Sequence, residues 1–313
     1  MSGKQSEIWT SDEEGVAHAV QRLREGGLVA LPTETVYGLA ARGDSAEAVA
    51  AIYRTKGRPD FNPLIVHVAD IDMAKSIARF DARAEALAAR FWPGPLTLVL
   101  PLIEGAAIAP AVTAGLSTIA LRQPAHPLAR RVLEKLHLPL AAPSANRSNG
   151  VSPTSAAHVL QSLGDRAPPV LDGGSCQAGL ESTIIALRRN GEWSLLRPGP
   201  VTAADLQSVL GKPATDARKS IEAPGQLEKH YSPGKPVRLD AKTAVDDEFH
   251  IGFGEIFGEI SLSRTADLAD AAARLYACLH EAAASEKARI AIAPVPQEGM
   301  GAAINDRLSR AAA

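Results

Sequence analysis

The chain of 313 residues is poor in cysteine and in aromatic residues, and it has no long apolar run. Its two cysteines, Cys176 and Cys278, are far apart and form no C-x-x-C pair, so they predict neither a disulfide framework nor a zinc site. No apolar run reaches the roughly 18 residues that a membrane-spanning helix needs. Residues 4–26 alternate charged and apolar positions and lack the apolar core of a signal peptide. We therefore expect a protein of the reducing cytoplasm with no membrane association.

The sequence also lacks an excess of positive charge. Its formal net charge is −2, and aromatic residues make up only 4% of it, which argues against a protein defined by nucleic-acid binding. A local cationic cleft could still hold an RNA backbone, so a weak contact with RNA stays open. With 46% hydrophobic and 22% charged residues, the chain can form a sizeable core.

Several catalytic and binding motifs are missing as well. The sequence contains no P-loop, no H-E-x-x-H and no G-x-S-x-G, and the glycines around Phe253 lack the third position of a dinucleotide fingerprint. His67, His158 and His230 are isolated from one another along the chain. A lone histidine more often packs than binds a metal, so we expect no metal held by the protein alone.

What the sequence does have is a series of polar loops at the ends of short apolar runs. The first begins with an apolar run at 28–31, which predicts a buried strand, and Pro32 ends it. Residues 33–37 then carry hydroxyl and carboxyl groups, a helix is predicted at about 46–55, and a second strand is predicted at 64–68. Loops at strand ends are where α/β proteins build small-molecule sites.

The same kind of loop recurs further along the chain. Arg122 ends a predicted strand at 119–122, where a guanidinium can fork onto a carboxylate or phosphate. Residues 143–153 follow another strand and are dense in hydroxyl and amide groups, and residues 181–183 and 197–200 flank two more. Each feature alone is equally consistent with an ordinary turn or a surface ion pair, so the repetition carries the argument.

Together these loops supply cations and neutral donors but few carboxylates. The cations are Lys56, Arg58, Arg122 and Arg197, and the neutral donors are Thr33, Thr35, Thr118, Ser144, Asn146, Ser152 and Ser182. That inventory suits an anionic ligand such as a nucleoside triphosphate beside a second small polar ligand. A metal at such a site would be Mg²⁺, carried largely by the phosphates and water.

The organisation of the chain predicts two α/β units. Residues 1–210 form the larger, opening with a helix at 11–25 for which Ser11 and Glu14 suggest a capping box. Periodicity fades over 211–236, which contain several prolines and glycines and predict a linker. Residues 237–313 predict a small α/β unit, with strands at 250–253 and 289–292 around a long helix at 267–284 and a last helix from residue 301 on.

At the level of whole motifs, the chain resembles the YrdC-like family in its long, two-domain form. The resemblance covers nearly the whole chain and rests on Pro32-Thr33-Glu34-Thr35-Val36-Tyr37-Gly38-Leu39, Lys56-Gly57-Arg58-Pro59, Asn62-Pro63-Leu64, Trp92-Pro93-Gly94-Pro95-Leu96-Thr97, Ala142-Pro143-Ser144-Ala145-Asn146, Glu181-Ser182-Thr183, Arg197-Pro198-Gly199, His230-Tyr231-Ser232-Pro233 and Asn305-Asp306-Arg307-Leu308-Ser309-Arg310-Ala311. It implies an α/β fold: a twisted mixed-sheet domain with helices, a linker, and a small Rossmann-like α/β domain.

The resemblance also implies an activity, the synthesis of L-threonylcarbamoyl-AMP and pyrophosphate from L-threonine, bicarbonate and ATP with Mg²⁺. A downstream transferase complex would then modify tRNA. Carried over motif by motif, the threonine site would be Thr35, His67, Arg122, Ala142 and Ser182. The ATP contacts would be Arg58, Asn62, Thr118, Ser144, Ser152, Arg197 and Tyr231. The catalytic polar tetrad would be Lys56, Arg58, Ser144 and Asn146.

Such a reaction needs positioned anions more than an acid–base pair. We hypothesise that the linker, with Tyr231, closes the pocket and protects a labile carbamate from water. Two alternatives remain: a nucleic-acid-binding module, and another carbamoyl-transfer enzyme of the same fold. Pyrophosphate release that requires ATP, threonine and bicarbonate together would distinguish all three.

Overall fold

The computed structural model describes residues 7–188, 190–211, 222–223 and 230–313. Most of the predicted linker, residues 212–221 and 224–229, lies outside the described residues, so the lid hypothesis can be followed only at its end, from His230 on. No helix of the described part of the chain is long and apolar enough to cross a bilayer.

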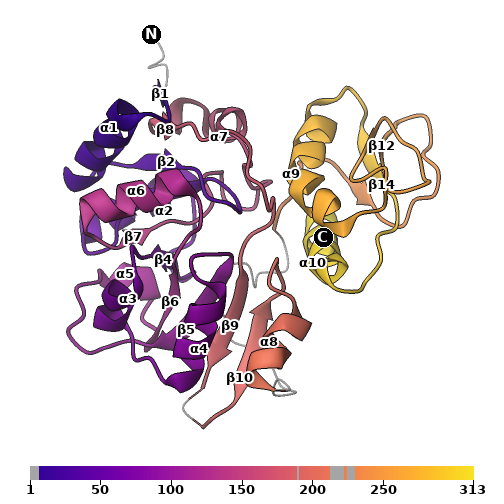
Figure 1. Ribbon diagram of the computed structural model, residues 1–313. Coiled ribbons are helices and arrows are strands. Elements are labelled where there is room, and N and C mark those ends of the chain that lie inside the picture. Colours follow the sequence, from indigo (N-terminus) through magenta and orange to yellow (C-terminus); the bar gives the residue numbers. More distant parts are fainter. Residues whose placement is uncertain (1–6, 189, 212–221, 224–229) are drawn as a thin grey trace.

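A ten-stranded mixed sheet forms the larger unit (Figure 1). In sheet order its strands are β1 (Ile8–Trp9), β8 (Val170–Leu171), β2 (Val29–Leu31), β3 (Gly38–Arg42), β7 (Leu140–Ala141), β4 (Ile65–His67), β6 (Thr118–Arg122), β5 (Leu96–Pro101), β9 (Thr183–Leu187) and β10 (Trp193–Arg197). Parallel and antiparallel pairs alternate irregularly along it, which confirms the predicted mixed-sheet class.

The register of this sheet places four loops at one edge. β4 and β6 are parallel, with His67 paired to Arg122 at their carboxyl ends. β5 is antiparallel to β6 and parallel to β9, with Leu96 opposite Thr183. The loops that enter β5 and β9 therefore meet the loops that leave β4 and β6. This edge is the one at which the sequence predicts a site.

Helices cover the sheet and fix its ends. They are α1 (Glu13–Arg24), α2 (Ala46–Lys56), α3 (Ile71–Ile77), α4 (Ala82–Phe91), α5 (Pro110–Thr113), α6 (Pro127–Leu136), α7 (Ala156–Leu163), a 3₁₀ turn (Gly164–Arg166) and α8 (Ala203–Leu210). Most begin at a side-chain cap; Ser45, for example, accepts a hydrogen bond from the amide of Ala48, and Gly57 ends α2 in the left-handed region.

Two local predictions for this unit are wrong. The N-cap of α1 is Asp12 rather than Ser11, because the Asp12 carboxylate accepts the amide of Gly15 at 2.9 Å, which leaves Glu14 one position too early for a capping box. Strand β3 was not predicted at all. Its run of glycine and alanine has low intrinsic strand propensity, and pairing with β2 and β7 on both sides supplies the stability instead.

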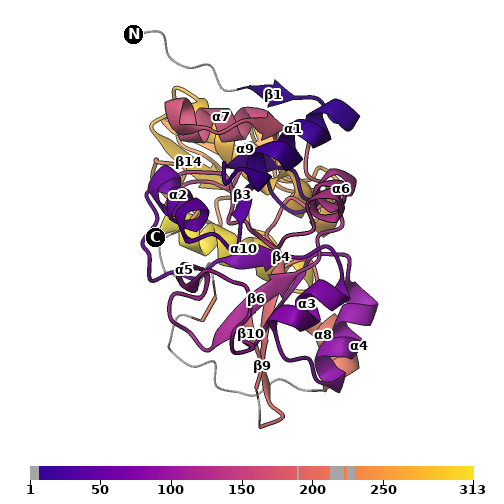
Figure 2. The same cartoon turned by 90° about the vertical axis from the view of Figure 1, so that its left-hand side faces the viewer.

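The smaller unit is an all-parallel four-stranded sheet with two helices, which confirms the predicted Rossmann-like class. Its strands, in sheet order, are β11 (Val237–Arg238), β14 (Arg289–Ile292), β12 (Glu248–Gly252) and β13 (Ile260–Ser261). Its helices are α9 (Leu268–Ala284) and α10 (Met300–Ala312). Figure 2, turned by 90°, shows this unit behind the larger one.

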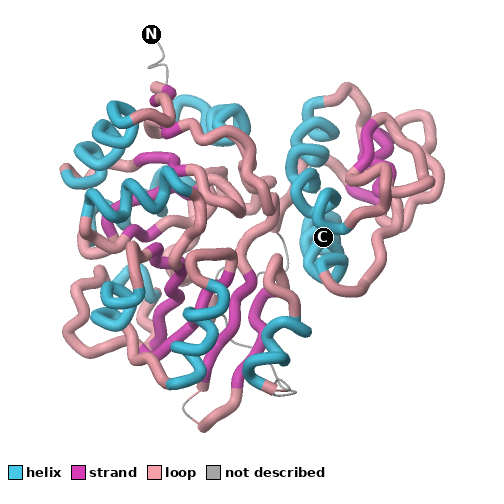
Figure 3. The backbone as a smooth tube through the Cα atoms, viewed as in Figure 1, coloured by secondary structure: helices cyan, strands magenta, loops and turns pink. Residues whose placement is uncertain are grey.

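The two units meet where loops of the large domain face α9 and α10 (Figure 3). The apolar core of the small unit continues into the large one through Val36, Val151, Leu180 and Tyr231. All four lie in or beside the loops for which the sequence predicts ligand contacts. The second domain is therefore packed directly against the predicted site.

Candidate active site

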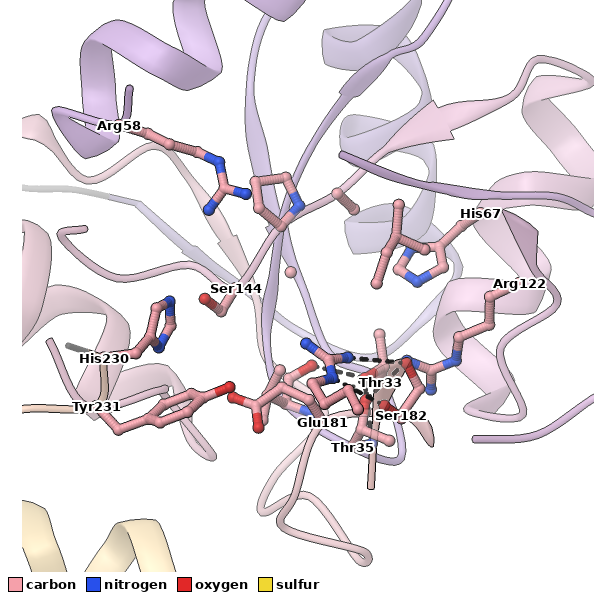
Figure 4. Close-up of a pocket in the computed structure, with 16 residues that line it drawn as sticks. Thr33, Thr35, Arg58, His67, Arg122, Ser144, Glu181, Ser182, His230 and Tyr231 are labelled. Carbon is pink, nitrogen blue, oxygen red and sulfur yellow. Dashed lines mark hydrogen bonds between the residues drawn. The ribbon is translucent and has the colours of Figure 1, made fainter. Parts of the chain in front are cut away.

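A pocket opens at the sheet edge where these loops converge (Figure 4). All five residues predicted to hold threonine line it, as do four of those predicted to contact ATP: Arg58, Ser144, Arg197 and Tyr231. In Figure 4, Arg58, Ser144, His230 and Tyr231 stand on one side, with His67 and Arg122 on the other. The pocket thus has two chemically distinct halves.

Five of the predicted residues do not line this pocket. Lys56 and Asn146 belong to the loop scaffold, because Lys56 Nζ donates to the carbonyls of Ser144 and Asn146, both at 2.6 Å. Burial, and then the Arg58 charge, hold the pKa of Lys56 well below its usual range. Asn146 Nδ2 in turn donates to the carbonyl of Gly150 at 2.8 Å. Half of the predicted tetrad therefore shapes the wall that presents Ser144.

The other three are also absent from the pocket lining. Asn62 is buried, and its Oδ1 has no hydrogen-bond partner among the described residues. Thr118 begins β6, at the opposite end of that strand from Arg122. Ser152 is fully buried and donates to Glu181 Oε1 at 2.5 Å. Of these, Asn62 has an unused acceptor that a ligand amino group could satisfy.

Arg122 is the fixed point of the half predicted to bind threonine. Its Nε donates to the Gly94 carbonyl at 3.1 Å, and its Nη1 donates to Thr35 Oγ1 at 2.9 Å. Nη2 lies 2.6 Å from Glu34 Oε1, an ion pair whose angle does not meet hydrogen-bond geometry. The guanidinium plane is thus held from three directions, and Glu34 already lies against Nη2.

Two further side chains complete this half. His67 is paired with Arg122 across β4 and β6, and burial followed by the Arg122 charge lowers the pKa of His67 to about 3. It is therefore neutral near pH 7 and can act only through hydrogen bonds. Ser182 Oγ lies 2.7 Å from Thr97 Oγ1 and accepts from Arg197 Nη2 at 3.1 Å.

The opposite half is cationic. Arg58 Nη2 donates to the Pro63 carbonyl at 3.0 Å, and burial, with the Arg197 charge adding to it, lowers the pKa of Arg58 to about 10. Arg58 and Arg197 both stay charged near pH 7. Two uncharged groups face them: Tyr231, at φ +64°, has a buried hydroxyl, and His230 has a buried Nδ1, neither with a hydrogen-bond partner among the described residues.

Glu181 lies between the halves and is fully engaged. It accepts hydrogen bonds from Ser152, from the Tyr276 hydroxyl at 2.7 Å and from Arg307 Nε at 2.9 Å. Burial would raise its pKa, but the Arg307 and Arg197 charges outweigh it and lower the pKa of Glu181 to about 2. Glu181 is thus a permanent anion, and it is committed to protein partners rather than poised as a base.

The comparisons with known proteins agree with this arrangement. A family model for the Sua5, YciO and YrdC proteins, described as "Telomere recombination", matches residues 21–199, and one described as "Threonylcarbamoyl-AMP synthase, C-terminal domain" matches residues 201–313. A threonylcarbamoyl-AMP synthase of Bacillus subtilis is 38% identical over 98% of this chain and 95% of its own. The chain belongs to the Sua5–YciO–YrdC family.

Solved and curated relatives extend the family match to both domains. The crystal structure of Pyrococcus abyssi Sua5 complexed with L-threonine superposes with a TM-score of 0.89 at 33% identity, covering 99% of this chain and 98% of that one. A threonylcarbamoyl-AMP synthase of Pyrococcus abyssi is 44% identical over 69% of this chain and 64% of its own. The YrdC-like, two-domain class expected from the sequence is thereby confirmed. The domain limits at 210 and 236 stay predictions.

Three residues of this Sua5-type site received no role from sequence reasoning: Glu34, Glu181 and Arg307. Each belongs to a motif that carries the family resemblance, so the motifs marked them. Their roles depend on partners far away in sequence; Glu181 and Arg307, for example, are 126 positions apart. No local pattern indicates such a pairing.

Proposed function

We propose that the protein is an L-threonylcarbamoyl-AMP synthase that forms threonylcarbamoyl-AMP and pyrophosphate from L-threonine, bicarbonate and ATP. The observation that carries the proposal is the two-sided pocket. One half offers a fixed guanidinium with neutral hydrogen-bonding groups, and the other offers buried cations. The relatives that share both domains with this chain are named as threonylcarbamoyl-AMP synthases.

The chemistry requires two bond-forming steps. The threonine amine attacks the carbon of bicarbonate, and loss of water leaves a carbamate on the amino group. A carbamate oxygen then attacks the α-phosphorus of ATP, and the bond to the bridging oxygen of the β-phosphate breaks, releasing pyrophosphate. Both steps bring anions together, so positioning and charge neutralisation are the main catalytic tasks.

The threonine half suits an amino-acid carboxylate. Arg122 lines the cavity with its plane fixed by Gly94 and Thr35, and a threonine carboxylate would share its Nη2 with Glu34 or replace Glu34 there. His67 and Ser182 offer neutral hydrogen bonds nearby, and Ala142 adds an apolar wall. Because His67 is neutral, the positive charge on this side of the pocket comes from Arg122.

The opposite half suits the triphosphate. Arg58 and Arg197 provide charge, Ser144 provides a hydroxyl held in place by the Lys56 scaffold, and Tyr231 covers the pocket wall. Mg²⁺ accompanying ATP fits as an ion carried by phosphates and water, since Glu181, which lines the pocket, and Glu34, the partner of Arg122, are both in ion pairs. Among the described residues, no cluster of three or more His, Cys, Asp or Glu side chains could hold a metal.

The proposal includes a place for the protein in the cell. The product is a reactive mixed anhydride that needs an acceptor, which we assign to a downstream tRNA threonylcarbamoyl transferase complex. The two cysteines are buried free thiols, which agrees with a cytoplasmic location.

The decisive test is pyrophosphate release with purified protein. We expect release when ATP, L-threonine and bicarbonate are all present with Mg²⁺, and a fall to background when any one is omitted. The acyl-adenylate should be detectable by mass spectrometry in the complete mixture. Release that ignores threonine would point to another carbamoyl-transfer reaction, and RNA binding without any release would point to a nucleic-acid-binding module.

A further inference from the structure

One guanidinium of the second domain reaches three segments of the pocket wall. Arg307, on α10, has no exposed surface. Its Nε donates to Glu181 Oε2 at 2.9 Å, and its Nη2 donates to the Pro198 carbonyl at 2.9 Å. Its Cζ lies over the Tyr231 ring, 5.4 Å from the centroid, in a cation–π contact. Asp306 binds the remaining nitrogen, Nη1, at 2.5 Å and fixes the guanidinium from its own helix.

Each of the three contacted segments carries a residue on the nucleotide side. Glu181 holds the hydroxyl of Ser152. Pro198 directly follows Arg197, and Tyr231 is itself a wall residue of the pocket. These segments come from the entry to β9, the exit of β10 and the residues just before β11. Arg307 thus contacts one predicted ATP residue, Tyr231, directly and reaches Ser152 and Arg197 through Glu181 and Pro198, and it forms no hydrogen bond with a predicted threonine residue.

We propose that Arg307 is a positioning residue for the ATP half of the active site, supplied by the second domain. The inference rests on the proposed function for what the site binds. It assigns the second domain a direct part in nucleotide binding: its buried arginine sets the relative placement of Ser152, Arg197 and Tyr231, while the threonine half is built by the large domain alone.

Electrostatics support the assignment. Glu181 is buried among charged or polar groups from several elements: Arg307 and Tyr276 from the second domain, Arg197 from β10, and Lys56 and His230 at longer range. Removing one partner of a buried ion pair leaves an uncompensated charge. Without Arg307, Glu181 would turn to Arg197, the other guanidinium whose charge acts on it, and would shift Arg197 within the pocket.

The competing explanation is that Arg307 only holds the domains together. In that case its removal would lower the melting temperature and the fraction of active protein, but the protein that folds would bind ATP normally. A positioning role instead predicts a selective loss of affinity for ATP. The ratio of the two substrate constants therefore separates the explanations.

The test uses the full-length protein with Arg307→Met, which keeps the apolar volume but removes the charge and the fork. We expect KM for ATP, and Kd for a non-hydrolysable ATP analogue measured by calorimetry, to rise about tenfold, because Arg197 and Tyr231 would no longer be held in place. KM for threonine should change less than twofold. Arg307→Lys should recover only part of the loss, since an ammonium cannot reach Glu181 and Pro198 together. Arg289→Gln, which removes an exposed charge of the same domain, should match wild type.

The double variant Glu181→Gln with Arg307→Met removes both buried charges and so protects the test against misfolding. We expect it to melt higher than Arg307→Met and yet to keep the weak ATP affinity. Full recovery of ATP affinity in the double variant, equal rises in both KM values, or a fall in kcat alone would each overturn the inference. The proposed function fails separately, if wild-type protein forms no threonylcarbamoyl-AMP; the analogue titration still decides the role of Arg307.

Discussion

At the residue scale, the site works through side chains whose charge state and direction are fixed in advance. Arg122 is held by Gly94, Thr35 and Glu34, and Glu181 is held by Ser152 and by the second domain. Both side chains are thus oriented before a ligand arrives. Preorganised charges of this kind do most of their work in a buried pocket, where water cannot screen them.

The role of Arg122 leads to a direct prediction. We expect Arg122→Ala to raise KM for threonine by about 10- to 100-fold, the range for a lost charged hydrogen bond. KM for ATP should stay within about threefold, because Arg58 and Tyr231 lie on the other side of the pocket (Figure 4). Initial rates of pyrophosphate release at varied threonine and ATP measure both constants. Normal dependence on threonine in this variant would remove the carboxylate role of Arg122.

His67 predicts a pH dependence of stability. Its pKa is about 3 in the folded chain against 6.5 as its ordinary value, so the unfolded chain binds more protons between these limits, and stability falls as pH drops through that window. At pH 5 the cost is about 2 kcal/mol relative to pH 7. We expect urea unfolding of His67→Asn to show a pH 7 to pH 5 loss smaller by about that amount. An unchanged loss would mean that His67 titrates normally.

At the element scale, the packing of α9 depends on a glycine of the large domain. Gly179 lies at φ +67°, and a Cβ there would come within 2.4 Å of Ala273 Cα and 2.5 Å of its carbonyl oxygen. These atoms are backbone of α9, so the helix itself would have to move. The loop and the helix approach this closely only because residue 179 has no side chain.

We therefore expect Gly179→Ala to destabilise the protein by about 2 to 4 kcal/mol through overpacking and backbone strain, and to weaken binding of an ATP analogue. Gly105→Ala is the matched control, because Gly105 has a similar φ of +76° and open space around it. Its cost should be about 1 kcal/mol, from strain alone. Equal losses in urea unfolding for the two variants would show that contact with α9 plays no part.

Sequence reasoning succeeded where structure is local. The strands β4, β6 and β14 and the helices α2 and α9 lie within one or two residues of their predicted ranges, because apolar periodicity and end signals such as Gly57 and Asp267 are written in the chain itself. It failed at β3, whose alanine-rich run is stabilised by two neighbours from other parts of the chain.

The site divides in the same way. The loops that carry Arg58, Arg122 and Ser182 were predicted as polar strand ends, and the structure gathers them in one pocket. The part played by Lys56, which supports Ser144 rather than facing the cavity, depends on contacts 88 and 90 positions away. Glu181 lies in the large domain, and its partner Arg307 lies in the small one. Residue pairs this far apart in sequence produce no local pattern from which the contact could be predicted.

At the scale of the whole molecule, the second domain is part of the pocket rather than an appendage. Its core shares Val36, Val151 and Leu180 with the loops of the large domain, and its Tyr276 and Arg307 reach Glu181. Removing it would expose that apolar surface and leave a carboxylate without two of its donors.

A chain ending at residue 210 should therefore lose ATP use while keeping much of its threonine site. We expect it to bind an ATP analogue at least tenfold more weakly than the full chain and to release no measurable pyrophosphate. Its Kd for threonine should stay within a few-fold, because Thr35, His67, Arg122 and Ser182 all precede that end. Calorimetric titrations of both ligands check this, and kinetics equal to those of the full chain would contradict it.

The division of the pocket between its two halves bears on the order of events during turnover. The larger unit alone forms the threonine side of the pocket, whereas the ATP side is completed by α10 and the segment around Tyr231. Threonine can thus bind first, before the nucleotide side of the pocket is complete, and ATP can bind second. Product-inhibition patterns would then show that pyrophosphate is released before the acyl-adenylate. The unstable anhydride would therefore stay in the pocket longest.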